Sequence, residues 1–452
     1  MVNGILVEQR LTSTPTTPHN LRNTESAPGL QNVPTSVSYS LLTQHMMFLS
    51  NRTTNSSYLS NVADTTAFVY FQRIFAGLKS TRHSPTSAHF IFSQYAKKLP
   101  IAMHFLLAVS HAELCVEQRV SFQAPSESLT HFEAGSELLR VRLKTFSTAR
   151  DHLETMLTYL YLFQFWLRRE RWFAKELQDL SMSVLLYVKA FSLDEICGAA
   201  DDDCTSQDAI EKALVSRVLC YLFDRDGFAA FSGYAGFFAN VAMQNAELWQ
   251  KIWLRFQAAF PLASRREAAV IEVYYRLIWI HHEVNCYSLQ RKDDSRASTR
   301  IKNQLREIRV RESWMFGLMA HRHSDVPEPS TMRLVAVAFY HAIVIYHYRC
   351  RSSPFGASPV PEDIQEALKG LFTCTRFAVR TRSVQLLERF QWSLFIAGVE
   401  TNDVANTEWV RESLADAVLK DVFGVVRDVK RNSHGCISLG TVRSLFTCNG
   451  CE

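Results

Sequence analysis

No apolar run in this sequence is long enough to cross a membrane. The two longest nearly apolar runs, 156–167 and 334–348, fall short of the roughly 18 to 20 residues that a spanning helix needs. Both runs are therefore expected to be buried helices. The first thirty residues are rich in Thr, Ser, Asn and Pro and lack the apolar segment of a secretory signal, which predicts an intracellular protein.

The ten cysteines do not follow the spacing of a disulfide framework. Cys115, Cys220 and Cys350 lie inside apolar stretches of helical periodicity. This distribution is typical of reduced thiols in the cytosol or nucleus. The sequons at Asn51 and Asn55 would then meet no glycosylation machinery.

The sequence also lacks a dense Lys/Arg run of the kind that marks a nucleic-acid-binding tract, although its net charge is +5. Two basic clusters stand out, and a phosphate-binding role is the alternative to a solvated helix face for both of them. The clusters are Arg168, Arg169 and Arg171, and Arg300, Lys302, Arg306, Arg309 and Arg311.

Composition and periodicity divide the chain into three parts. Residues 1–60 form a Ser/Thr/Asn/Pro-rich head that is expected to be disordered. In residues 61–431, apolar side chains recur at spacings of three and four and never with period two, which predicts an all-α fold of packed helical hairpins. A polar subdomain joint is placed near 194–208, and residues 432–452 form a short Cys-containing tail.

Local signals predict where several helices begin. Asp64 or Thr65 could cap the first helix, and Pro100 suits the first turn of another. Ser264 and Glu267 have the spacing of a capping box at the start of a helix that runs to about residue 290. The last four helices are expected at 331–350, 361–379, 383–398 and 407–430.

The search for metal-binding motifs gives near misses. His282 and Glu283 begin a helical His-Glu pair, but the residue four after His282 is Cys286, which breaks the two-histidine zinc arrangement. Asp201, Asp202 and Asp203 invite comparison with the Asp-rich magnesium motif of terpene synthases. Thr205 stands where the later carboxylate of that motif belongs. The second magnesium motif of these enzymes needs a carboxylate one turn after its Ser, but the residue four after Ser288 is the basic Lys292. A solvated acidic joint is therefore the simpler interpretation.

The tail offers half a zinc site. Cys448 and Cys451 have the right spacing, and His434 and Cys436 lie shortly before them. Free thiols on a frayed terminus are the expected state, with a four-ligand structural site as the alternative.

Catalytic signatures are equally thin. The sequence holds neither a Ser between glycines in a nucleophile elbow nor a Gly-rich phosphate loop. Asp224 and Asp226 flank Arg225 at a predicted helix end, where a turn signal is the main interpretation and a ligand-facing role the alternative. We therefore expect no enzyme, and we assign no catalytic, cofactor-binding or metal-binding residue.

Four segments follow one another in an order that resembles a known family. They are 99–114, LPIAMHFLLAVSHAEL; 131–143, HFEAGSELLRVRL; 216–236, SRVLCYLFDRDGFAAFSGYAG; and 391–414, QWSLFIAGVETNDVANTEWVRESL. Together they make the span from about 65 to 430 similar to the fungal-specific transcription factor domain, the regulatory region of fungal zinc-cluster transcription factors. That family's DNA-binding cluster needs six cysteines near the N-terminus, whereas the first cysteine here is Cys115.

The resemblance implies transcription regulation, including regulation of secondary metabolism, in the nucleus or between nucleus and cytoplasm. It implies a large helical regulatory domain that contacts partners or a small-molecule effector, often within a homo- or heterodimer. Without the zinc cluster, we expect recruitment by another DNA-bound transcription factor or by the transcription machinery. Direct DNA binding is then expected to be weak or absent, and no membrane partner is expected.

Two alternatives remain open at this point. A helical effector-binding protein or metabolic enzyme would hold an apolar pocket with converging acids or histidines, whereas a partner-binding regulator would have a filled core and an apolar surface patch. The third interpretation is that the cluster was lost with the 5′ end of the gene, or that the gene is a decaying copy.

Overall fold

The computed structural model describes most of the chain after the predicted head. The described residues are 61–82, 87–118, 123–144, 148–169, 171–199, 207–259, 265–290, 294–317, 329–351, 353–381, 384–385 and 387–447. Within these ranges every regular element is a helix, apart from two isolated β-bridges, so the all-α prediction is confirmed. None of the described helices is long and apolar enough to span a bilayer. The predicted head, 1–60, lies outside the described residues.

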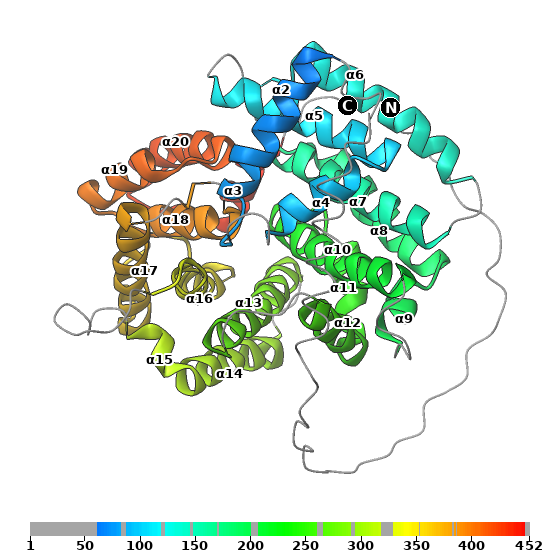
Figure 1. Ribbon diagram of the computed structural model, residues 1–452. Helices are drawn as coiled ribbons and strands as arrows, with labels where there is room; N and C mark the ends of the chain where they lie inside the picture. The colour runs from blue at the N-terminus through cyan, green and yellow to red at the C-terminus, as the bar shows by residue number, and fades with distance from the viewer. Residues whose placement is uncertain are drawn as a thin grey trace, which may run out of the picture. The chain divides into compact units, whose positions relative to one another are not determined.

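The first group of helices runs from α2 to α9, and α5 contacts several of them (Figure 1). α2 packs on α5, and α5 packs on α6 and α7. Pro100 opens α5 as predicted. The bounds are α2 Val62–Tyr70, a π-helical turn Phe71–Phe75, α3 Ala76–Leu78, α4 Ala88–Ala96, α5 Pro100–Glu117, α6 Ser126–Arg142, α7 Ala149–Leu167, α8 Ala174–Ala190 and α9 Leu193–Gly198.

The predicted cap of the first helix is wrong. Asn61 is the N-cap of α2, and its side chain accepts a hydrogen bond from the Ala63 N–H. Asp64 lies one turn further on, where its carboxylate contacts His111 of α5. An Asp near the start of a helix can cap that helix or pair with a residue of another helix, and the sequence alone does not distinguish these two roles.

The second group follows the predicted joint without a break in the core. α9 occupies 193–198, with Leu193 and Cys197 buried, and α10 then packs directly against α7. Residues 200–206 lie outside the described part of the chain. The bounds are α10 Gln207–Ala229, a 3-10 turn Ala230–Ser232, α11 Phe237–Gln244, α12 Ala246–Ala259, α13 Arg265–Leu289, α14 Ser295–Arg311 and α15 Ser313–Phe316.

The third group is arranged around α16, which packs against α13, α17 and α18 (Figure 1). α16 is buried along almost its whole length, as its apolar sequence predicts. The bounds are α16 Thr331–Arg349, α17 Glu362–Thr381, α18 Glu388–Glu400, α19 Val404–Ser413, α20 Ala417–Asn432 and α21 Leu439–Phe446.

The prediction of one helix over 407–430 is wrong, because the helix is interrupted at 414–416, between α19 and α20. The side-chain oxygen of buried Gln391 accepts hydrogen bonds from the N–H groups of Ala415 (2.8 Å) and Asp416 (3.1 Å). Asp416 then caps α20 by accepting from the Leu419 N–H. A side chain from α18 therefore satisfies the backbone groups that a continuous helix would have paired internally.

Residues 432–447 of the tail pack on the rest of the fold, whereas Cys448 and Cys451, for which a frayed terminus is expected, lie outside the described residues. α21 buries Leu439, Val442 and Phe446, and the Trp172 N–H donates to the Phe446 carbonyl over 2.8 Å. The Trp172 and Phe446 rings also lie 4.8 Å apart, centroid to centroid. Aromatic burial of this extent holds the C-terminal helix against the rest of the fold.

Candidate functional site

The candidate site is the exposed side of α14, whose opposite side is fixed in the core. Ala297, Ile301, Leu305 and Ile308 recur at spacings of three and four, and all four are buried. Asp294 caps the helix by accepting from the N–H groups at the start of the first turn. This is the amphipathic pattern expected for a surface helix, and α14 packs on α13 and α16 as a result.

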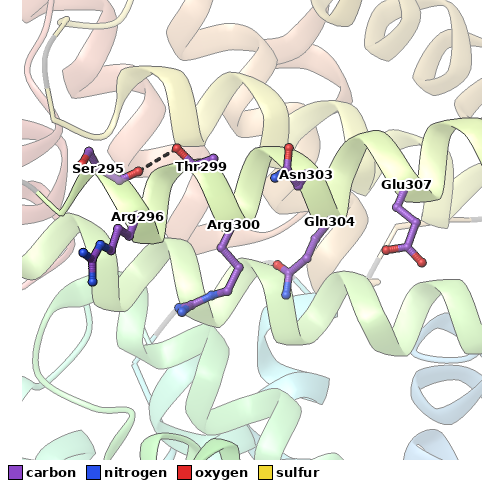
Figure 2. A pocket seen from close by; sticks show the side chains of 7 residues that line it. All are labelled: Ser295, Arg296, Thr299, Arg300, Asn303, Gln304 and Glu307. Atoms are coloured by element: carbon purple, nitrogen blue, oxygen red, sulfur yellow. Dashed lines mark hydrogen bonds between the residues drawn. The ribbon is translucent and has the colours of Figure 1, made fainter. Parts of the chain in front are cut away.

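An open polar hollow of about 500 Å³ runs along the exposed side of α14, as Figure 2 shows. All of its lining residues come from this one helix, and all of them have polar side chains. The residues are Ser295, Arg296, Thr299, Arg300, Asn303, Gln304 and Glu307. A second cavity, beside Glu113 and Arg168, holds about 10 Å³, which is room for about one water molecule.

Several of the basic side chains on α14 already have partners. Arg300 donates to Glu283 of α13 over 3.0 Å, and Arg311 lies 2.9 Å from Glu307. The guanidinium of Arg309 stacks over the ring of Phe316 at 4.2 Å. Burial raises the pKa of Glu283, and the charge of Arg300 opposes that rise.

The remaining three basic side chains of α14 point away from the core. Arg296, Lys302 and Arg306 are exposed, and none of their side chains forms a hydrogen bond or ion pair with a residue in the described part of the chain. Exposed and unpaired cations on one helix create a local positive potential that attracts an acidic surface. This side of α14 therefore carries exposed positive charge.

The other predicted basic cluster is not a surface. Arg168 is almost fully buried and forms ion pairs with Glu113 (2.9 Å) and Asp416 (2.6 Å), joining α5, α7 and the start of α20. Those two carboxylates raise the pKa of Arg168 in spite of its burial. Arg169 stacks on Phe165 at 3.8 Å, and burial lowers its pKa to about 10. A phosphate could not reach Arg168 without displacing its partners.

Asp224 and Asp226 also point into the protein. The Arg389 guanidinium donates to Asp224 over 2.8 Å, and the charges of Arg225 and Arg389 lower the pKa of Asp224 although burial opposes them. Asp226 accepts the N–H groups of Gly236 and Ala239, both at 2.9 Å, while burial raises its pKa. Both carboxylates therefore connect helices and turns inside the protein.

The His282 segment forms a hydrogen-bonded cluster around an amide. His282 Nε2 and Cys286 Sγ each lie 2.9 Å from the Asn240 side-chain oxygen. Burial lowers the pKa of His282 to about 3, so the ring is neutral near neutral pH. Asp201, Asp202, Asp203, Ser264, Lys292, Cys448 and Cys451 lie outside the described residues.

One polar cluster was missed by sequence reasoning. Asp64, His111 and His131 meet between α2, α5 and α6, although 47 residues separate Asp64 from His111 and 67 separate it from His131. No spacing rule links residues so far apart, so only the packing of the three helices could show the cluster.

The comparisons with known proteins support a regulatory domain. Residues 268–431, which run from α13 to α20, match the family model described as the fungal specific transcription factor domain. The predicted resemblance is thereby confirmed, and 391–414 lies inside the match whereas the other three quoted segments precede it. The sequence matches no curated protein and no solved structure.

Proposed function

We propose that this chain, which carries a fungal specific transcription factor domain at residues 268–431, regulates transcription in the nucleus by contacting a protein that is itself bound to DNA. The family match is the observation that carries the proposal.

The basic face of α14 is the surface we assign to that contact. It lies within the matched region, and its exposed cations Arg296, Lys302 and Arg306 suit an acidic segment of a partner protein. Charge complementarity of this kind speeds association and selects partners, and its contribution weakens as salt rises. A small-molecule effector fits this face less well, because the hollow along α14 is open and is lined by a single helix.

A tethered reporter assay tests the proposed function. The full chain is fused to an unrelated DNA-binding domain in a fungal host, and reporter output is compared with that of the same chain without the fused domain. A rise or fall that depends on tethering is the expected result. An unchanged reporter, with the fusion shown to be folded and nuclear, would contradict the proposal and favour an enzymatic or effector-binding role.

A DNA-binding measurement separates the partner route from direct contact. The purified chain is expected to bind duplex DNA only weakly, without sequence preference, and less as salt rises, because its cations are scattered. Tight, sequence-selective binding by the purified chain would overturn the partner route while leaving transcription regulation intact.

A further inference from the structure

The Asp64 cluster has the geometry of a small metal-binding site. Nε2 of His111 lies 2.8 Å and Nε2 of His131 lies 3.1 Å from the same oxygen, Oδ1 of Asp64. All three donor atoms lie within 4.8 Å of one another. In a tetrahedral zinc site with bonds of about 2.0–2.1 Å, donor atoms are about 3.4 Å apart, so small side-chain adjustments would bring these three onto one ion.

We propose that Asp64, His111 and His131 bind a divalent transition-metal ion of the zinc type. Two imidazoles and one carboxylate are a donor set that Zn²⁺ accepts, and three protein ligands leave a further position for water. Each ligand comes from a different helix, namely α2, α5 and α6. The ion therefore ties α2 to the helices on which it packs.

The surroundings of His131 match those of a metal ligand. Its second ring nitrogen, Nδ1, lies 3.0 Å from Nδ1 of His104 on α5. When Nε2 of His131 binds the ion, Nδ1 carries the proton and donates it to His104. A ligand histidine almost always donates its other N–H in this way, and the contact fixes its ring orientation.

Burial of the cluster also suits an ion. Asp64 and His111 are buried, whereas the His131 side chain is 15% exposed, so the site is screened from bulk water but has an entry on the His131 side. Without metal, the two rings donate their Nε2 protons to the carboxylate. On binding, each neutral ring moves its single proton to Nδ1, so that Nε2 is free to hold the ion.

Titration of the purified full chain tests this site. After treatment with a chelator, the chain receives Zn²⁺ alone, and binding is followed by calorimetry and by thermal unfolding. One ion per chain and a higher Tm are expected. Asp64→Asn and His131→Gln are expected to abolish binding, and His104→Ala to weaken it by about 10- to 100-fold.

Two control variants exclude other metal-binding groups. His152 is a half-buried histidine outside the cluster, and its ring forms a hydrogen bond with the Tyr187 hydroxyl. His152→Gln should therefore leave metal binding unchanged. Cys448→Ser combined with Cys451→Ser removes the thiols at the C-terminus, and it should also leave binding unchanged. Co²⁺ provides a second readout, because imidazole and carboxylate ligands give its visible bands without the charge-transfer band of a thiolate.

Three results would overturn the site. The wild-type chain could bind no ion, folded Asp64→Asn and His131→Gln variants could bind as tightly as wild type, or binding could disappear with the two terminal cysteines. Circular dichroism without metal verifies the fold of each variant. If a ligand variant fails to fold, the Co²⁺ spectrum of the wild-type chain tests the site instead. A thiolate charge-transfer band would show that cysteines bind the ion, and the proposed site contains no cysteine.

Discussion

Nε of Arg389 on α18 donates a hydrogen bond to Oδ1 of Asp224 on α10 over 2.8 Å, with both residues buried. The same guanidinium donates to the Asp224 backbone carbonyl, also over 2.8 Å. Asp224 pairs in addition with Arg225, which reaches Glu388 of α18. The family-matched helix α18 is therefore tied to α10, which precedes the matched region.

Replacing Arg389 with Leu should destabilise the protein strongly. The change leaves the buried Asp224 carboxylate with Arg225 as its remaining guanidinium partner, and breaking a buried pair costs up to about 3–5 kcal/mol of unfolding free energy. The measurement is urea unfolding followed by circular dichroism. Arg411→Ala is the control, because its ion pair with Glu408 is exposed, and it should leave the urea midpoint unchanged. Equal urea midpoints for the two variants would show that the ion pair between Arg389 and Asp224 does not stabilise the protein.

Gly398 and Gly424 both lie in helices, and replacing each with alanine should change the stability of the protein in opposite directions. A Cβ at Gly398 would meet the Phe423 ring at 2.6 Å and Val410 at 2.8 Å, so Gly398→Ala should cost about 1–3 kcal/mol by overpacking. A Cβ at Gly424 meets nothing within 4 Å, so Gly424→Ala should stabilise by about 0.5–1 kcal/mol. Thermal unfolding of the two variants gives the sign, and a stable Gly398→Ala protein would refute the close approach of α18 to α20.

The C-terminal helix should contribute to stability despite its position near the end of the chain. Phe446 is fully buried, so Phe446→Ala should cost about 3–5 kcal/mol by opening a cavity. Ser444→Ala, on the exposed side of α21, is the matched control and should have almost no effect. A Phe446→Ala protein as stable as wild type in urea would contradict the packing of α21 against the rest of the fold.

Buried histidines should make the protein acid-sensitive. Burial lowers the pKa of His89 and of His282 to about 3, from an ordinary value of 6.5. Because the unfolded chain binds these protons first, stability is present above pH 6.5 and is lost as the pH falls toward 3. The slope reaches about 1.4 kcal/mol per pH unit for each histidine.

His282→Gln should flatten that profile. Glutamine retains a polar contact toward Asn240 but cannot take up the proton, so the loss of unfolding free energy between about pH 7 and about pH 5 should shrink. Urea titrations at both pH values measure the loss. An unchanged pH dependence in a folded variant would contradict a neutral, buried His282.

The periodicity of the sequence predicted those helices whose apolar stripe decides their position. α14 is the clearest case, because Ile301, Leu305 and Ile308 are all buried as their spacing requires. The break between α19 and α20 could not be predicted, since it depends on Gln391 from another helix. Local pattern therefore located the helices, while the contacts between helices decided their ends.

The candidate site was only partly visible in the sequence. The basic cluster on α14 was identified from the sequence, and the structure separates its paired members from exposed Lys302 and Arg306 and adds exposed Arg296 to them. Arg168 looked equally basic in sequence but lies buried between two carboxylates. Exposure and pairing depend on tertiary contacts, which a one-dimensional charge pattern does not contain.

The central claim is that the exposed cations of α14 recruit an acidic partner to regulate transcription. Its most direct test is the tethered reporter with Arg296→Glu and Arg306→Glu combined, compared with the unchanged tethered chain. The matched control combines Arg73→Glu and Lys175→Glu, which reverses two exposed cations on other helices and changes the net charge equally. The account predicts that the α14 variant, folded and nuclear, loses most of the tethering-dependent effect while the control retains it. Full activity of the α14 variant would contradict the account.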